Sequence, residues 1–239
     1  MTRTFLTAEW RYLAMLHYEV EPAVLAPLLP TGTELDDRGG HYYVGLVGFL
    51  FLDTHIFGLP ALFHQNFEEV NLRFYVRREV AGERRSGVVF IREMVPLPLV
   101  SEAARLTYNE PYRTVPMQHA LVETNGKLHS VEYVFGGQRD QCRFALHVDG
   151  ASRELQRNSE EEFFSERGWG YTAQRGGGTI EYRVRHDRWR VWPNARWELV
   201  RNLASFYDPP FAGIISAEPS SAFIADGSSV SVYLPERIA

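Results

Sequence analysis

The segment EVNLRFYVRREV, residues 69–80, alternates apolar and polar side chains, and this alternation decides the kind of fold that the chain can adopt. One set of alternate positions is apolar: Val70, Leu72, Phe74 and Val76. The other set is mainly polar: Glu69, Asn71, Arg73, Tyr75 and Arg77. Because successive side chains of a β-strand point to opposite faces, a period of two predicts a strand with one apolar face.

The flanking segments predict further strands around this one. AGERRSG (81–87) is rich in turn-forming residues, and GVVFIREM (87–94) follows it, so we expect an antiparallel hairpin with a loop of about five to seven residues. The apolar, glycine-interrupted run at 42–52 predicts a buried strand. Residues 128–135 and 141–148 predict a second hairpin, whose later strand faces inward with Cys142, Phe144, Leu146 and Val148.

The rest of the chain adds two strands and a few short helices. Strands are expected at 179–192 and 228–235. Helices are expected at 21–30, ended by Pro30; at 158–168, with a capping box from Ser159 to Glu162 and a stop at Gly168; and at 195–207, from the spacing of Trp197, Val200 and Leu203. We therefore expect an α+β, β-dominated fold, largely antiparallel and barrel-like, rather than a doubly wound sheet.

Size and charge narrow the class of protein. A chain of 239 residues with 45% hydrophobic residues can form one domain with a sizeable core, which we expect to span residues 1–239. The net charge is −5 and the arginines alternate with acidic residues, so nucleic acid is not an expected partner. No signal-like core or bilayer-length apolar run is present, which predicts a cytoplasmic protein without a membrane partner. The oligomeric state stays open.

Few residues suggest metal or cofactor chemistry. Cys142, the single cysteine, lies among alternating apolar positions, which favours a buried inert thiol over a nucleophile. The eight histidines share no short ligand spacing, so we expect no metal; His41 and His55, which flank one apolar strand, are the pair to check first. Phosphate-binding glycine loops, HExxH and GxSxG are absent from the sequence, and no cofactor is expected.

Several ordered motifs resemble the YqjF-like family of uncharacterised bacterial proteins, a domain of unknown function. They are AEWRYLAMLHYEVEP, LLPTGTELDDRGGHYYVGLVGF, FEEVNLRFYV, GVVFIREM with AARLTYNEPY, and EYRVRHDRW. That family is distantly similar to the acetoacetate decarboxylase-like superfamily. The resemblance implies a cone-shaped, largely antiparallel barrel with a few short helices around an interior pocket, and it brings no established activity.

The decarboxylase resemblance also argues against decarboxylase chemistry. In that superfamily an arginine precedes a Pro-Lys-Lys triplet by six positions, and here Arg105 precedes Pro111-Tyr112-Arg113 by the same spacing. The nucleophilic lysine position is then Tyr112, and a phenol cannot form the imine that a primary amine forms with a ketone. The single lysine, Lys127, lies in a turn-like TNGKLH segment, so Schiff-base decarboxylation is not expected.

The candidate site residues each have two interpretations. Arg73 and Arg105 either hold an anionic or carbonyl ligand or form an internal ion pair with Glu69 or Glu110. Glu69, Tyr75 and Tyr112 either act as acid/base groups or form a hydrogen-bond network between strands. Arg113 keeps a positive charge where the decarboxylases have their second lysine. Trp10 with Arg11, and His186 with Trp189, complete the motifs, and such aromatic residues usually line a core or a pocket wall.

Three functions follow from these residues. The first is a small-molecule-binding domain whose pocket, lined by Glu69, Arg73, Arg105, Tyr112 and Arg113, suits a carboxylate or carbonyl ligand such as a keto acid. The alternative is a lyase- or isomerase-type enzyme that works without a Schiff base and uses Tyr112 and Glu69 as acid/base groups. The second alternative is a protein-interaction module without a pocket, and a packed interior would distinguish it from the other two.

Overall fold

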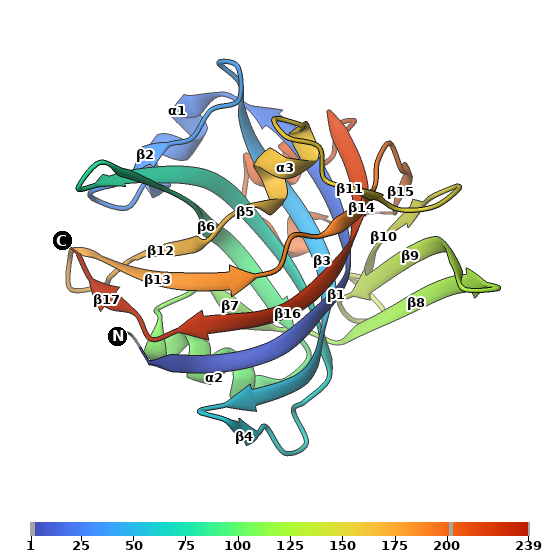
Figure 1. Cartoon of the computed structure of the whole chain (residues 1–239), viewed down its shortest axis with the longest axis horizontal. Coiled ribbons are helices and arrows are strands. Elements are labelled where there is room, and N and C mark those ends of the chain that lie inside the picture. Colours follow the sequence, from blue (N-terminus) through green and yellow to red (C-terminus); the bar gives the residue numbers. More distant parts are fainter. Residues whose placement is uncertain (1–2, 201–202, 239) are drawn as a thin grey trace.

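The computed structural model describes residues 3–200 and 203–238, and strands dominate it (Figure 1). The helices are short: α1 (Pro22–Leu25), α2 (Pro98–Thr107), α3 (Glu160–Ser165) and α4 (Phe211–Ile214), with the 3-10 turns η1 (Ala26–Leu28) and η2 (Leu203–Ser205). Within the described residues, none of these helices has the length and apolar character needed to cross a membrane.

Among the described residues, thirteen strands form one large sheet. They are β1 (Thr4–Val20), β2 (Glu34–Leu35), β3 (Tyr42–Ile56), β4 (Leu59–Pro60), β5 (Phe67–Val80), β6 (Glu83–Val95), β7 (Tyr112–Thr114), β11 (Arg153–Glu154), β12 (Trp169–Ala173), β13 (Thr179–His186), β14 (Arg190–Trp192), β16 (Ser221–Tyr233) and β17 (Glu236–Arg237). The long neighbours run β16-β1-β3-β5-β6-β12-β13, and only the β6–β12 and β6–β7 pairs are parallel. The expected barrel is a strongly curled sheet, in which β13 comes round to pair with β16 over residues 184–186.

A second sheet, with four strands in the part of the chain that the structure describes, packs against the outside of this curl. Its order is β15 (Arg196–Val200), β10 (Cys142–His147), β9 (Lys127–Phe135) and β8 (Met117–Thr124). Its inward side chains share one core with the apolar face of β5, including Val70 and Leu72. At Gly48 a Cβ atom would lie 2.6 Å from Tyr133 and 2.7 Å from Phe144, so a glycine is what allows these rings to approach β3.

The alternation of β5 is confirmed, but neither of its faces is exposed along the centre of the strand. Val70, Leu72 and Phe74 are fully buried under the second sheet. Glu69 and Asn71, on the other face, are 3% and 1% exposed. The polar face of this strand therefore points into the interior of the curl, where polar side chains need a structural or functional reason to be buried.

The β5–β6 hairpin is tighter than expected. Only Ala81 and Gly82 connect the two strands, and both have positive φ angles, of 50° and 83°. Two such residues form the primed turn that matches the twist of a hairpin. Residues 83–86, which the sequence assigned to the loop, instead extend β6.

The helix expected at 195–207 is wrong. Residues 196–200 form β15, which pairs with β10 along its whole length. Partly buried Trp197 and Leu199 alternate with exposed neighbours, so the period is two, and the helix-like spacing of Trp197, Val200 and Leu203 is a coincidence. Arg201 and Asn202, which belong to the expected helix, lie outside the described residues.

Other elements follow the sequence closely. The cap of α3 is confirmed, because the Glu162 amide donates to Ser159 Oγ at 3.2 Å, although the helix ends at Ser165, before Gly168. The inward set of β10 is confirmed by the complete burial of Cys142, Phe144 and Leu146. The strand expected at 179–192 is divided into β13 and β14.

Candidate functional site

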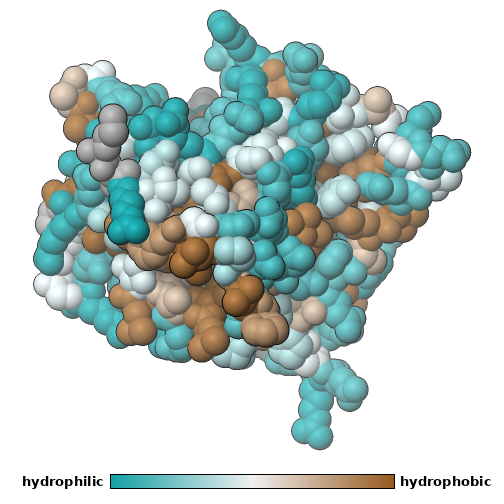
Figure 2. Space-filling view, turned by 60° about the horizontal axis from the view of Figure 1, so that its bottom comes forward, coloured by the Kyte–Doolittle hydropathy of each residue, from teal (hydrophilic) through white to brown (hydrophobic). Residues whose placement is uncertain are grey.

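A cavity of about 420 Å³ lies within the curl of the large sheet. Its walls come from the inner faces of β1, β3, β5, β6, β12 and β13, from α2 and from residues 61–64. Leu62 and Leu99 line it although these residues are 69% and 68% exposed, so the cavity reaches the surface. Figure 2, which brings the face with α2 and β4 forward, shows apolar side chains gathered on that face.

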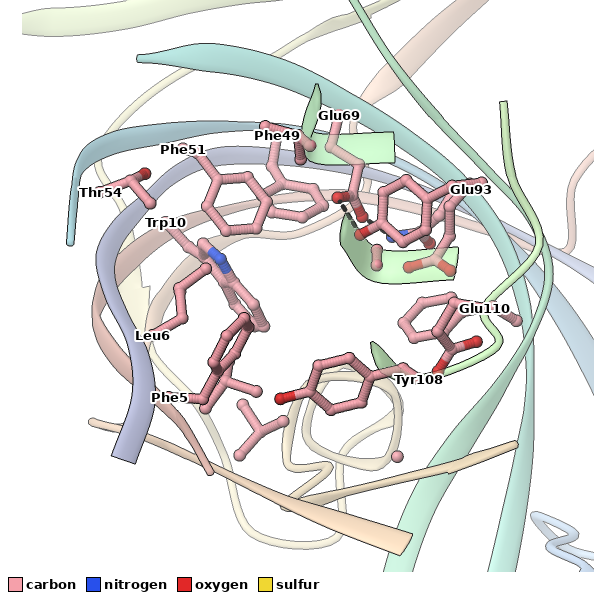
Figure 3. Close-up of a pocket in the computed structure, with 18 of the residues that line it drawn as sticks. Phe5, Leu6, Trp10, Phe49, Phe51, Thr54, Glu69, Glu93, Tyr108 and Glu110 are labelled. Atoms are coloured by element: carbon pink, nitrogen blue, oxygen red, sulfur yellow. Dashed lines mark hydrogen bonds between the residues drawn. The ribbon is translucent and has the colours of Figure 1, made fainter. Parts of the chain in front are cut away.

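One side of the cavity is apolar and the other carries carboxyl groups (Figure 3). Phe5, Trp10 and Phe51 lie on the apolar side. Glu69, Glu93 and Glu110 lie opposite, and together they are called here the carboxyl cluster. Their residues are 3%, 2% and 5% exposed. An apolar cavity with a few convergent polar groups is the usual form of a small-molecule site.

The carboxyl cluster is assembled from three neighbouring segments. Glu69 comes from the inner face of β5, and Glu93 comes from the end of β6. Glu110 lies between α2 and β7, and the parallel pairing of β7 with β6 places Tyr112 beside Glu93. The turn after α2 reverses at Asn109, whose φ is 58°, and this brings Glu110 back toward the sheet.

Hydrogen bonds satisfy some of the cluster and leave the rest open. Tyr112 Oη donates to Glu69 Oε2 at 2.9 Å, and Asn71 Nδ2 donates to Glu69 Oε1 at 3.0 Å. Thr172 Oγ1 and Tyr182 Oη both donate to Glu110 Oε1, at 2.6 and 2.8 Å. Among the carboxyl cluster and Asn71, three buried oxygens have no hydrogen-bond partner in the described residues: Glu93 Oε2, Glu110 Oε2 and Asn71 Oδ1.

Burial makes the cluster bind protons near neutral pH. Burial raises the pKa of Glu69 to about 7, against the hydrogen bonds from Asn71 and Tyr112, which lower it. Burial likewise raises the pKa of Glu110 to about 7, against the hydrogen bonds from Thr172 and Tyr182. The pKa of Glu93 is raised well above its usual value by burial and by the charges of Glu110 and Glu69. The three groups share protons rather than all being ionised.

The phenols around the cluster stay protonated. Burial and the charges of Glu69 and Glu93 raise the pKa of Tyr112 well above its usual value. Burial and the charge of Glu110 do the same for Tyr182. Both hydroxyls are therefore hydrogen-bond donors at neutral pH, and neither is a nucleophile or a base in the resting site.

The arginines expected in the pocket are dispersed. Arg73 lines the cavity, is 8% exposed and donates to the Phe164 carbonyl at 3.3 Å. Arg105 lies on an exposed side of α2 and pairs with Glu102 at 3.2 Å. Arg113 is exposed and donates to the Ser205 carbonyl at 2.8 Å. Of these three, only Arg73 lines the cavity.

Of the other predicted site residues, some line the cavity and others do not. Glu69, Glu110 and Tyr112 meet in the cavity, as described above. Tyr75 is 2% exposed, lies outside the cavity lining and shares a 2.8 Å hydrogen bond with His17 Nε2. Trp10 lines the cavity, as do His186 and Trp189, whose rings stack at 4.3 Å. Lys127 is exposed at the start of β9.

His41 and His55 each have a partner of their own. His41 pairs with Glu19 at 2.5 Å, and His55 contacts the Asp53 carbonyl at 2.8 Å. Across residues 3–200 and 203–238, no group of three or more His, Cys, Asp or Glu side chains is placed to hold a metal ion. Cys142 is buried.

Sequence reasoning missed Glu93, and a bulge explains why. Leu72 pairs with Arg92 and the next residue, Arg73, pairs with Phe90, so Ile91 is an extra residue in β6. Before the bulge the even-numbered residues Val88 and Phe90 face the cavity. After the bulge the odd-numbered residue Glu93 faces it. Strict alternation would have turned Glu93 away from the side of Phe90. The available signal was a glutamate near the end of an otherwise largely apolar run in GVVFIREM, directly after Arg92.

The sequence is similar to one protein family and to a bacterial protein. The sequence model of the DUF2071 family, described as "Uncharacterized conserved protein", matches residues 7–229. "Uncharacterized protein YqjF" of Bacillus subtilis (strain 168) is 25% identical over 201 residues, which is 82% of this chain and 78% of that protein.

Solved structures share the fold at low sequence identity. Acetoacetate decarboxylase from Legionella pneumophila superposes with a TM-score of 0.70 at 13% identity, covering 98% of this chain and 87% of the other. An acetoacetate decarboxylase-like enzyme from Sphingomonas wittichii gives 0.67 at 14%, covering 98% and 92%. The enduracididine biosynthesis enzyme MppR complexed with pyruvate gives 0.66 at 11%, covering 100% and 92%. The fold is therefore acetoacetate decarboxylase-like.

Proposed function

This chain belongs to the DUF2071 family, and we propose that it is a small-molecule-binding protein whose ligand lies in the cavity with an apolar body and a polar head. The observation that carries the proposal is a cavity of about 420 Å³ with an aromatic side and a buried carboxyl cluster opposite. Burying three carboxyl groups is costly without a partner, so their presence at the end of an apolar cavity favours a ligand-binding role over a purely structural one. That MppR, a protein of the same fold, holds pyruvate also supports it.

The structure distinguishes between the two polar head groups that the sequence favoured for the ligand, a carboxylate and a carbonyl. A carboxylate head would meet three carboxyl groups and one guanidinium, that of Arg73, because Arg105 and Arg113 lie outside the cavity. A carbonyl head can accept a hydrogen bond from a protonated carboxyl or from a phenol of the site. The carbonyl is thus the better supported of the two. A pocketless interaction module is not proposed, because it requires a packed interior. A cytoplasmic location stays a prediction.

Filling the cavity is expected to abolish binding. Ala104, on α2, lines the cavity, and Ala104→Trp would place an indole in the ligand's space. We expect at least one of three probes, namely 4-phenylbutan-2-one, 4-phenylbutanoate and 4-phenylbutylammonium, to raise the melting temperature of the wild-type protein. The Ala104→Trp protein should show no such shift. The matched control is Ala120→Trp, at an exposed position of β8, and it should behave as wild type. Equal shifts in both variants, or no shift with any probe, would contradict the proposal.

A second candidate function is proton transfer next to a carbonyl group. Two cavity carboxyls, Glu69 and Glu110, have pKa values raised to about 7, which is the range in which a group exchanges protons efficiently at neutral pH. Ionised Glu69 would remove a proton from the carbon next to a ligand carbonyl, while a protonated neighbour would donate to the developing enolate oxygen. No covalent bond to the protein is needed.

Deuterium exchange tests this second function. In heavy water we expect the protein to speed deuterium incorporation at the carbons beside the carbonyl of 4-phenylbutan-2-one, followed by NMR. Glu69→Gln removes the base and should slow the enzyme-dependent exchange by about 100-fold or more. Arg105→Gln, on the exposed side of α2, is the control and should leave the rate unchanged. If the wild-type protein exchanges the ketone no faster than buffer does, only the binding function remains.

A further inference from the structure

The carboxyl cluster and the neighbouring Asn71 hold three unpartnered acceptors, and the rest of the described lining holds unpartnered donors, among them Arg73 Nε and Trp10 Nε1. Glu93 Oε2, Glu110 Oε2 and Asn71 Oδ1 are buried and have no partner among the described residues. Protonation turns a carboxyl oxygen into a donor but still leaves neighbouring acceptors to satisfy. A carbonyl oxygen carries no hydrogen to give them. A ligand head with several N–H groups would satisfy all three, and an unsatisfied buried acceptor is expensive.

The charge balance of the site points the same way. The cavity lining holds the three carboxyl groups of the cluster and the guanidinium of Arg73. The other arginine of the lining, Arg167, is already paired at 2.5 Å with buried Asp36 and is not available to the cluster. Full ionisation would thus leave an excess of negative charge in a region that excludes water, and either protons or a bound cation must neutralise it.

The walls next to the cluster suit a cation as well. Tyr108, Tyr112 and Tyr182 line the cavity beside Glu110, and the rings of Tyr108 and Tyr182 meet edge to face at 4.9 Å. Aromatic faces attract a desolvated cation, and carboxylates bind its N–H groups with charge-assisted hydrogen bonds. Such a site also accepts the apolar part of the molecule along Trp10 and Phe51.

We infer that the polar head of the ligand is a protonated amine, whose N–H groups bond Glu93, Glu110 and Asn71 while its apolar body lies along the aromatic side of the cavity. The inference rests on the proposed binding function and narrows its ligand to an organic ammonium ion. It makes binding a proton exchange, because the bound cation replaces protons held by the cluster. The affinity for the ammonium therefore rises with pH, until the free amine itself deprotonates.

The phenols that face the cluster keep their protons in this pH range. Tyr108, Tyr112 and Tyr182 have pKa values raised by burial first and by neighbouring carboxyl charges second, so they remain protonated. Arg73 and Arg167 also line the cavity. His64 and His186 line it as well. The phenols are therefore not the source of the released proton, and the carboxyl cluster supplies it in this proposal.

Calorimetric titration with the three probes tests the inference. At about pH 7.5, 4-phenylbutylammonium should bind about tenfold or more tightly than 4-phenylbutan-2-one, and 4-phenylbutanoate should be the weakest. Its affinity should increase between about pH 6 and about pH 8, and titrations in buffers with different heats of ionisation should show proton release. A ketone or carboxylate that binds more tightly than the ammonium overturns the inference and leaves the proposed function in place. Failure of all three probes overturns both.

Variants of the cluster separate charge from shape. Glu93→Gln and Glu110→Gln keep the volume and remove one acidic group, so each should lower ammonium affinity by about tenfold while ketone affinity changes less than about twofold. Glu102→Gln, an exposed acid of α2, is the control and should change neither. Circular dichroism checks that each variant is folded. An equal loss for ammonium and ketone would assign Glu93 and Glu110 a structural role and overturn the inference.

Discussion

Raising the pH from about 5 to about 8 is expected to lower the free energy of unfolding by several kilocalories per mole. The unfolded carboxyls titrate near pH 4.5, whereas in the folded protein the pKa is about 7 for Glu69 and Glu110 and well above its usual value for Glu93. Between these values the folded state holds more protons than the unfolded state, so stability falls as pH rises. A shift from 4.5 to about 7 corresponds to at most about 3 kcal/mol for each of Glu69 and Glu110.

One buried group opposes this trend without reversing it. Burial, together with the charges of Arg73 and Arg167, holds the pKa of His17 well below its usual value. The unfolded state therefore takes up a proton at this imidazole below about pH 6.5, which lowers stability toward acid. Three carboxyls outweigh one imidazole, so the net slope between about pH 5 and about pH 8 stays downward.

Urea unfolding at a series of pH values measures the effect. Glu93→Gln, which keeps the shape of the side chain and removes its ionisation, should make the protein more stable than wild type at about pH 8 and flatten the pH dependence. Glu102→Gln should follow the wild-type curve, because its carboxylate is exposed. A stability that is constant or rises from about pH 5 to about pH 8 would mean that the three carboxyl groups are not buried together.

Local patterns predicted the strands better than they predicted the site. The alternation at 69–80 identified β5 and placed Glu69, Asn71 and Arg73 on one face, because the strand is regular where they lie. It could not tell that this face is buried, since burial depends on how far the whole sheet curls. The bulge at Ile91, which turns Glu93 into the cavity, depends on the pairing of two strands and leaves no mark in the spacing.

Arg105 illustrates a different limit. Its six-residue spacing from Pro111 resembles the decarboxylase pattern, and the fold resemblance is real. In this chain, however, α2 runs through Thr107, and the rotation of the helix directs Arg105 to Glu102 and solvent. Glu110, just beyond the helix, faces the cavity instead. An equal spacing in the sequence places two residues alike in two relatives only when the helix or strand between them has the same length and rotation.

Gly227→Ala is expected to destabilise the protein by about 3 to 5 kcal/mol, a large effect for the addition of one methyl group. Gly227 has a φ of 84°, a conformation that costs an L side chain about 1 to 2 kcal/mol. In addition, its Cβ atom would overlap the backbone carbonyl of Trp10, whose carbon would lie only 2.7 Å away. Because both atoms belong to the β1–β16 ladder, neither can move without breaking the pairing of Arg11 with Gly227.

Gly82→Ala separates the two contributions. Gly82 has nearly the same φ, of 83°, in the β5–β6 turn, but a Cβ atom there meets nothing within 4 Å. It should therefore cost only the conformational part, about 1 to 2 kcal/mol, in the same urea unfolding experiment. The difference between the two variants measures the close approach of β16 to β1, which fixes Trp10 in the cavity wall. If both substitutions cost the same, these strands are not as close as described, and the aromatic side of the cavity is not held in place by the backbone.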